Sequence, residues 1–208
     1  MFNYKGFRYA EVKIDNKVDL NKNNLTAYFT HTDVEPIGSV ETSNNLINKI
    51  WDATNKAYLS NLFGYPTDCP QREKNGWTGD AHTVIETALF NFDGILVYEK
   101  WMDDHRDEQQ IDGTLPSIIP TAGWGYSWGN GPDWTSSMIL VPWNVYKFYG
   151  DTRILEENYE NMRRYVSKIK SVSKNNLTSW GLGDWVPVKS KSNLEFTSSI
   201  FYYTDVLL

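Results

Sequence analysis

The feature that most constrains the fold is an apolar periodicity of helical spacing that begins near residue 42 and recurs to the end of the chain. Before that point, residues 1–41 alternate apolar and polar side chains, are rich in strand formers, and carry turn signals at 15–16 and 23–24. After it, apolar residues recur every three or four positions, as they do on one face of an α-helix. We therefore expect a mainly α-helical domain preceded by a short β segment. The expected helices cover residues 44–62, 81–92, 95–110, 134–149, 152–172 and 197–208.

Local signals indicate where these helices begin and end. Ser43 is expected to cap the first helix, and Asp80 is a plausible N-cap of the second. Pro142 is expected to interrupt the helical pattern that follows Asp133, and Gly150 is expected to stop it. The connections between successive helices thus alternate between short links and long segments.

The long connections carry acidic residues together with tryptophan. One runs from Asp68 to Asp80, and the others contain Asp133-Trp134 and Asp184-Trp185. Residues 112–132 are also rich in glycine and proline, and so long a connection without its own secondary structure is uncommon unless it serves a function. If the helices stack in pairs around an axis, alternate connections gather at one end of the domain. A sugar pocket would be built there.

Composition limits the class of partner. Nine Trp and thirteen Tyr favour either a heavily packed core or a surface that is apolar and hydrogen-bonding at once, as a sugar requires. The net charge of −6 and the lack of a dense basic cluster argue against nucleic acid. No apolar run approaches the roughly 20 residues of a membrane span.

Cysteine and histidine argue against a metal or a disulfide. The one cysteine, Cys69, excludes an internal disulfide, and the three histidines have no metal-ligand spacing, so no metal and no cofactor are expected. A catalytic Cys69 would need an activating base that the sequence does not show. The residues that are present include no signal peptide, which slightly favours a cytoplasmic location.

The segment from Tyr65 to His82 carries the chemistry. Asp68, Glu73 and Asp80 lie within thirteen residues of one another, with Trp77 between the last two. Cleavage of a glycosidic bond needs a protonated acid and a second carboxylate, and crowding beside an aromatic wall raises the pKa of one of them. Plainer interpretations stay open on spacing alone: Asp80 as a helix cap, Asp68 as a turn former, and Arg72 as an ion-pair partner of one of the acids.

The run DCPQRE followed by GWTGDA resembles the signature of the bacterial α-L-rhamnosidases of glycoside hydrolase family 78. Further matches extend the resemblance over nearly the whole chain, in FRYAEV, SNNLINKIW, VPWNVYKFYGD, GDWVP and TSSIFYY. The resemblance implies an (α/α)6 toroid that hydrolyses terminal α-L-rhamnose with inversion of configuration. A rhamnose-containing glycoside or oligosaccharide is then the expected partner.

The resemblance also assigns roles to residues. Glu73 matches the general acid, and Asp68 and Asp80 match carboxylates that hold the sugar hydroxyls. Rhamnose is a 6-deoxy sugar, so its methyl group favours an aromatic wall and its hydroxyls favour charged acceptors. The predicted substrate-binding residues are Asp68, Arg72, Trp77, Asp80, Asp133, Trp134 and Trp185.

The chain is expected to be part of a longer catalytic unit. About six helices are predicted against the twelve of a toroid, and the family's catalytic base is a glutamate that follows the equivalent of Leu208. We therefore predict that residues 1–41 are the end of a β-sandwich domain with its linker, and residues 42–208 the first half of the toroid. Exposed helix faces would then favour self-association and weak or absent activity of the isolated chain.

Two other interpretations stay open at this stage. One is a related toroid glycosidase with a different sugar preference, and the other is a non-catalytic rhamnose-binding or structural fragment, which the missing base favours.

Overall fold

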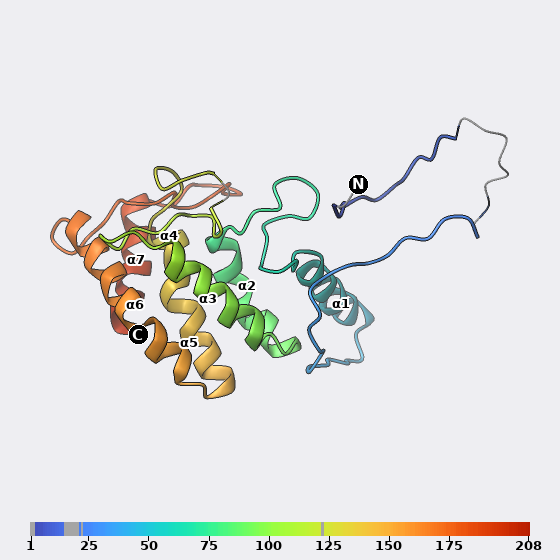
Figure 1. The fold of residues 1–208 in the computed structure, drawn as a ribbon, viewed down its shortest axis with the longest axis horizontal. Coiled ribbons are helices and arrows are strands. Elements are labelled where there is room, and N and C mark those ends of the chain that lie inside the picture. The colour runs from blue at the N-terminus through green and yellow to red at the C-terminus, as the bar shows by residue number, and fades with distance from the viewer. Residues whose placement is uncertain (1–2, 15–20, 22, 122) are drawn as a thin grey trace.

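The computed structural model describes residues 3–14, 21, 23–121 and 123–208. Within these residues the chain forms seven helices and no extended β-ladder, so the expected mainly helical fold is confirmed (Figure 1). The helices are α1 (Asn45–Ser60), α2 (Thr78–Asn91), α3 (Ile95–Glu108), α4 (Pro132–Thr135), α5 (Ser137–Tyr149), α6 (Arg153–Val172) and α7 (Leu194–Leu207).

The helices pack as hairpins around one apolar core. α2 and α3 are joined by a short link at Gly94, and α5 and α6 by a short link at Gly150, so both pairs are antiparallel (Figure 1). α5 packs against α2, α3 and α6 and is therefore central. Trp101, Tyr98 and Tyr165 are the largest fully buried side chains of this core. Their burial supplies much of the apolar area that stabilises the hairpins.

The long connections all lie at the opposite end from these short links. The segments 61–77, 109–121, 123–131 and 173–193 gather above the helices, at the top of Figure 1. This arrangement follows from the alternation of short and long connections between antiparallel helices. It brings acid- and tryptophan-bearing loops, far apart in sequence, to one end of the domain.

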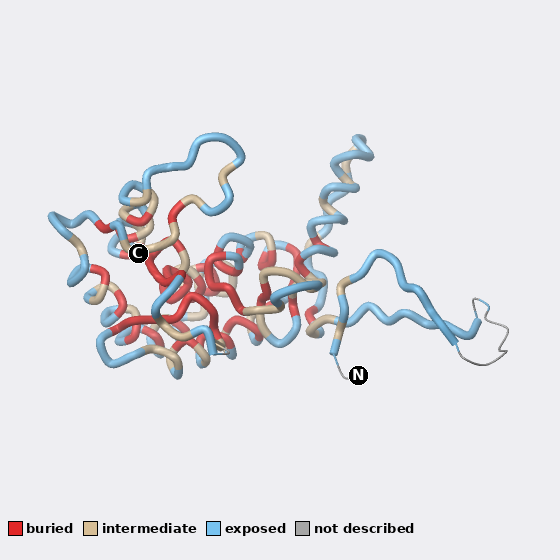
Figure 2. The backbone as a smooth tube through the Cα atoms, turned by 90° about the horizontal axis from the view of Figure 1, so that it is seen from above, coloured by how far each residue is buried: buried red, intermediate tan, exposed pale blue. Residues whose placement is uncertain are grey.

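The expected β segment at the start of the chain is not observed. The described residues of 1–41 run as an extended, mostly exposed arm, whose one recorded pairing is an isolated bridge between Pro36 and Phe92 (Figure 2). A strand needs a partner that accepts its backbone hydrogen bonds along its length, whereas the described part of this arm makes only scattered ones, such as that from the Thr32 N–H to the Leu62 carbonyl at 2.8 Å. The turn signal at 15–16 lies outside the described residues.

The first two helices begin at residues other than those predicted. The cap of α1 is Asn44 and not Ser43, because the Asn44 side chain accepts a hydrogen bond from the backbone N–H of Leu46 at 2.9 Å. α2 begins at Thr78, so Asp80 lies in its first turn and is not its cap.

The cause of this shift in α2 is a tertiary contact. The backbone N–H and the hydroxyl of Thr78 both donate to the carbonyl of Ser117, at 2.9 Å each. Asp80 is thereby left free of a capping role while it still complements the positive end of the helix dipole.

The predicted interruption at Pro142 is also wrong. Pro142 lies inside α5, and the break falls at Ser136, between α4 and α5. The prediction at the other end is confirmed, since Gly150 ends α5 in the left-handed conformation with φ of 68°. Val141 and Val145, on either side of Pro142, are fully buried, and their packing stabilises the helix across the proline.

Candidate active site

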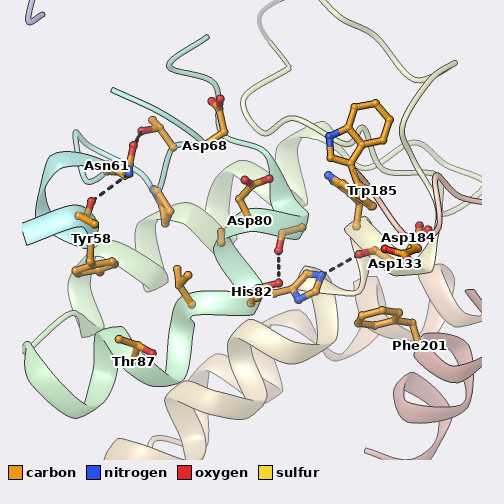
Figure 3. A pocket seen from close by; sticks show the side chains of 18 of the residues that line it. Tyr58, Asn61, Asp68, Asp80, His82, Thr87, Asp133, Asp184, Trp185 and Phe201 are labelled. Atoms are coloured by element: carbon orange, nitrogen blue, oxygen red, sulfur yellow. Dashed lines mark hydrogen bonds between the residues drawn. The ribbon is translucent and has the colours of Figure 1, made fainter. Parts of the chain in front are cut away.

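A cavity of about 740 Å³ opens among the long connections. It lies between the C-terminal part of α1, the first three turns of α2, α4, the loop that precedes α7 and the first half of α7. In Figure 3 Asp68 and Asp80 lie on one side of it, Asp133, Asp184 and Trp185 lie on the other, and His82 lies between. The five sequence-predicted residues that line it are Asp68, Asp80, Asp133, Trp134 and Trp185.

Asp68 and Asp80 form an acidic pair on the α2 side of the cavity. The Asp68 carboxylate accepts a hydrogen bond from the backbone N–H of Asn75 at 3.0 Å, which closes the loop between them. Desolvation of the Asp80 carboxyl within the cavity, together with the negative charges of Asp68 and Glu73, raises its pKa to about 6. Near neutral pH this site therefore holds a carboxyl group that is close to its own titration point.

Glu73 and Arg72 do not line the cavity, and both are exposed. The Glu73 carboxylate accepts a hydrogen bond from the indole N–H of Trp77 at 2.7 Å, so the side chain is held at the edge of the site by a tryptophan. The backbone N–H of Glu73 donates to the sulfur of Cys69 at 3.3 Å. Cys69 thus serves the turn that presents Glu73.

A row of five tryptophans joins Glu73 to the cavity. Trp77 packs edge-on against Trp124 and Trp128, with ring centroids 5.7 Å away in each case. Trp128 in turn contacts Trp185 at 6.1 Å, and Trp185 contacts Trp134 at 6.4 Å. The predicted aromatic walls are therefore one continuous surface that runs from the acid-bearing loop into the cavity.

Asp133 uses its carboxylate to hold the loop before α7. The side chain is buried and accepts a hydrogen bond from the backbone N–H of Gly183, while its other oxygen has no hydrogen-bond partner among the residues that the structure describes. A Cβ at Gly181 would collide with the same carboxylate, so this close approach requires glycine. Burial raises the pKa of Asp133 to about 6. The structure thus places this predicted sugar-binding residue against backbone groups that carry Asp184 and Trp185.

Sequence reasoning gave no role to His82, which lies at the centre of the cavity. Its ring Nε2 donates to the carbonyl of Asp133 at 3.2 Å, and its ring packs edge-on against Phe201 at 5.4 Å. Burial lowers the pKa of His82 to about 4, so the ring is neutral at neutral pH. Its position two residues after Asp80 is the one signal that could have placed it near the site.

Asp184 was seen in the sequence beside Trp185 but was not assigned to the site. Its carboxylate lines the cavity and accepts hydrogen bonds from the backbone N–H and the hydroxyl of Ser192, at 3.0 Å each. These bonds fold the loop 184–192 back on itself at the cavity mouth.

The part of the chain that the structure describes contains no cluster of three His, Cys, Asp or Glu side chains placed to hold a metal ion. In the same residues no helix is both long and apolar enough to cross a lipid bilayer.

Helical hairpins that present acids and tryptophans around one open cavity define the class of hairpin-toroid glycosidase domains. The chain belongs to the bacterial alpha-L-rhamnosidase 6 hairpin glycosidase domain family, whose model matches residues 35–208.

Curated relatives of this chain are named alpha-L-rhamnosidases. An alpha-L-rhamnosidase of Formosa agariphila is 32% identical over 99% of this chain, and one of Alteromonas sp. is 32% identical over 89% of it. The chain spans 23% and 20% of the lengths of these two proteins.

Solved structures show the same fold. An α-L-rhamnosidase from Dictyoglumus thermophilum matches 85% of this chain and 20% of its own, with 39% identity and a TM-score of 0.79. One from Aspergillus terreus matches 90% and 23%, with 32% identity and a TM-score of 0.81. A Streptomyces avermitilis enzyme complexed with L-rhamnose matches 84% and 17%, with 26% identity and a TM-score of 0.80.

Proposed function

We propose that this domain binds the terminal α-L-rhamnosyl group of a glycoside and takes part in its hydrolysis with inversion. The observation that carries the proposal is the cavity, which combines the carboxylates of Asp68, Asp80 and Asp184 with the tryptophan surface. A 6-deoxy sugar fits such a site, because hydroxyls need charged acceptors and the methyl group needs an apolar wall. The rhamnosidase relatives and the relative complexed with L-rhamnose support the choice of sugar.

Glu73 is the proposed proton donor. Its carboxyl lies at the end of the tryptophan row, outside the cavity that would hold the sugar, which suits a group that protonates the oxygen leaving that sugar. Asp68 and Asp80 are proposed to hold ring hydroxyls. Asp80 is the competing donor, because its raised pKa leaves part of it protonated near pH 6.

The second carboxylate of an inverting pair is proposed to come from a part of the longer protein that follows Leu208. Inverting glycosidases separate their two carboxyl groups by about 6.5–9.5 Å, with the attacking water between them. The chain covers about a fifth of the length of its curated relatives, which supports a contribution from elsewhere in the protein. Residues 1–41 are proposed to end a preceding β-sandwich domain.

The direct test compares Glu73→Gln with Asp80→Asn in the full-length protein that carries this domain. Loss of the general acid is expected to lower kcat on an unactivated natural rhamnoside by about 10²–10⁴-fold and to leave L-rhamnose affinity nearly unchanged. An aryl rhamnoside with a good leaving group needs less protonation, so Glu73→Gln is expected to spare it. If Asp80→Asn abolished activity and Glu73→Gln kept full activity, the general acid would be Asp80 and not Glu73.

A non-catalytic rhamnose-binding domain is the second candidate. It is favoured by the Glu73 carboxylate, which is already occupied by the Trp77 indole and does not line the cavity. Binding of L-rhamnose by calorimetry without release of rhamnose from any rhamnoside by the full-length protein would select this candidate.

A further inference from the structure

We propose that the contact between Tyr4 and Lys74 positions the turn that carries Glu73, so that a segment preceding the residues matched by the family model sets the place of the proton donor. Tyr4 and Lys74 are positioning residues, because they act through Glu73 and do not line the cavity. This inference rests on the proposed function, since it assumes that Glu73 donates the proton. It adds a contact, between residues seventy positions apart in the sequence, on which that donation depends.

Lys74 follows Glu73 directly, and its side chain reaches the first described residues of the chain. The ammonium group donates to the backbone carbonyl of Tyr4 at 2.9 Å and to the side-chain oxygen of Asn3 at 3.4 Å. It also lies over the Tyr4 ring, 4.7 Å from the ring centroid. In Figure 1 the start of the arm accordingly lies beside the loop that joins α1 to α2. A cation bound by a carbonyl and an aromatic face at once is held in a defined position.

The backbone of Lys74 makes this contact matter for Glu73. Its φ of 57° lies in the left-handed region, which lysine enters rarely and keeps only where surrounding contacts hold it. On the far side, Asn75 is fixed to Asp68 by two hydrogen bonds, of 3.1 and 3.0 Å. Because Asn75 is fixed, a rotation about φ of Lys74 would move Glu73. The bonds of the Lys74 side chain thus hold the residue that sets the direction of the proposed donor.

Tyr4 also packs against the beginning of the same loop. Its ring lies 4.5 Å from that of Phe63, with the two planes inclined by 31°. Two residues further on, the arm passes so close to the turn that a Cβ at Gly6 would come within 3.0 Å of the Cβ of Gln71. Among residues 3–14, all of which the structure describes, only Tyr4 and Gly6 are half-buried. This part of the arm is therefore fixed to the loop at these positions and not along its length.

Glu73 is consequently held by two independent contacts. The Trp77 indole donates to its carboxylate at 2.7 Å, and the Tyr4–Lys74 contact holds the backbone that follows it. A general acid must lie within about 2.6–3.2 Å of the oxygen that it protonates. A misplacement of about 1 Å can lower the rate a hundredfold. Loss of the Tyr4–Lys74 contact is therefore expected to reduce turnover and to spare sugar binding.

The test compares a natural rhamnoside with an aryl rhamnoside that has a good leaving group, in the full-length protein that carries this domain. Lys74→Asn removes the ammonium group and keeps a residue type that tolerates the left-handed conformation. Tyr4→Ala removes the ring. Each is expected to lower kcat on the natural rhamnoside by about tenfold to a hundredfold, with KM and L-rhamnose affinity within about twofold of the unmodified values. The aryl rhamnoside needs less protonation, so its kcat is expected to fall by less than about threefold.

Conservative variants separate positioning from a general loss of structure. Lys74→Arg keeps a cation that can donate to the Tyr4 carbonyl, and Tyr4→Phe keeps the ring, so both are expected to retain most of the unmodified kcat. The matched controls lie on the same arm. Lys13→Asn removes a lysine that pairs with Glu11 at an exposed position, and Tyr9→Ala removes a ring that is 81% exposed. Both controls should leave kcat unchanged.

Glu73→Gln in the same assays distinguishes this inference from the proposed function. If Glu73→Gln leaves kcat on the natural rhamnoside unchanged, the proposed donor is wrong and this inference fails with it. If Glu73→Gln lowers kcat while Lys74→Asn and Tyr4→Ala keep the unmodified value, only the positioning role is refuted. Equal losses of the two variants on both substrates would also refute it, since the damage would then extend beyond the proton donor.

A measurement on the unmodified chain covers the case in which the variants do not fold. Nuclear Overhauser spectra should show cross-peaks from the Tyr4 ring protons to the Phe63 ring and to the ε-methylene group of Lys74, as the two short distances require. Assigned resonances without these cross-peaks would overturn the inference.

Discussion

Asp80 links the electrostatics of the cavity to a measurable pH dependence. Burial and the charges of Asp68 and Glu73 raise its pKa to about 6, so it is neutral below that pH and ionised above it. An ionised carboxylate is the stronger acceptor for a sugar hydroxyl. We expect L-rhamnose affinity to rise severalfold as the pH increases through about 6, measured by calorimetry.

The matched variant is Asp80→Asn, which has no titrating group at this position. Its affinity for L-rhamnose should lose this rise around pH 6, while any contribution from Asp133 would persist. Superimposable pH curves for the variant and the unmodified chain would show that Asp80 does not contact the sugar.

The buried carboxyl of Asp133 leads to a prediction about how the free energy of unfolding depends on pH. Its pKa is raised from 3.8 to about 6 by burial, so the folded chain binds this proton more tightly than the unfolded chain does. The free energy of unfolding therefore falls as the pH rises between these values, by an amount of about 3 kcal/mol for this group, and the penalty is absent below the lower value.

Asp133→Asn keeps an oxygen that can accept from the Gly183 N–H and removes the ionisation. Relative to the unmodified chain, the variant should gain stability at about pH 7.5 and show little difference at about pH 4. Urea unfolding at the two pH values measures this. An equal difference at both would mean that Asp133 is not neutralised by its burial.

At the scale of helices, one hydrogen bond connects α7 to the start of α5. The hydroxyl of Ser136 donates to the buried carboxyl of Asp205 at 2.6 Å, and within the described part of the chain the other oxygen of that carboxyl has no hydrogen-bond partner. Burial raises the pKa of Asp205 well above its usual value, which favours the protonated form of this carboxyl in the folded chain.

Ser136→Ala would leave the Asp205 carboxyl buried without its recorded donor. We expect a loss of about 1–3 kcal/mol in the free energy of unfolding, measured with urea near neutral pH. Ser171→Ala, at an exposed position on α6, removes a hydroxyl of the same kind and should change little. Equal effects of the two substitutions would show that the Asp205 contact does not hold α7.

The helices themselves were predictable because their apolar period records the face that meets the core. Their exact ends were not, because tertiary contacts set them. Thr78 begins α2 through its bonds to Ser117, thirty-nine residues away, and the break at Ser136 coincides with its bond to Asp205. A local pattern contains no information on such partners.

The candidate site shows the same limit: its residues could be identified from the sequence, but their arrangement could not. The acids and tryptophans of the loops are visible in the sequence, and five of the predicted residues do line the cavity. Their arrangement depends on how distant segments approach one another. This holds for the bond from Gly183 to the Asp133 carboxylate and for the central place of His82. It holds also for the position of Glu73 beside Trp77. Spacing along the chain does not encode that approach.

At the scale of the whole molecule, the two faces of α7 differ in exposure, and this difference predicts how the chain behaves in solution. One face of the helix is buried through Ser198, Tyr202 and Asp205, against α4 and α6. The opposite face exposes a row of large apolar side chains, namely Phe196, Ile200, Tyr203 and Leu207. A row at this spacing forms a continuous apolar stripe along the helix, and water-exposed stripes of this kind favour association.

We therefore expect the isolated chain to self-associate through α7 in a concentration-dependent manner. Light scattering should give a mass above the 24.1 kDa of one chain as the concentration rises. The double variant Ile200→Lys, Tyr203→Lys places charge in the middle of the stripe, at positions that are 47% and 66% exposed, so it should remain a monomer and keep its fold. The matched control is Val188→Lys, which adds a charge at a 98% exposed position outside α7 and should leave association unchanged. A monomeric unmodified chain, or association that persists in the double variant, would show that this face does not drive contact between copies.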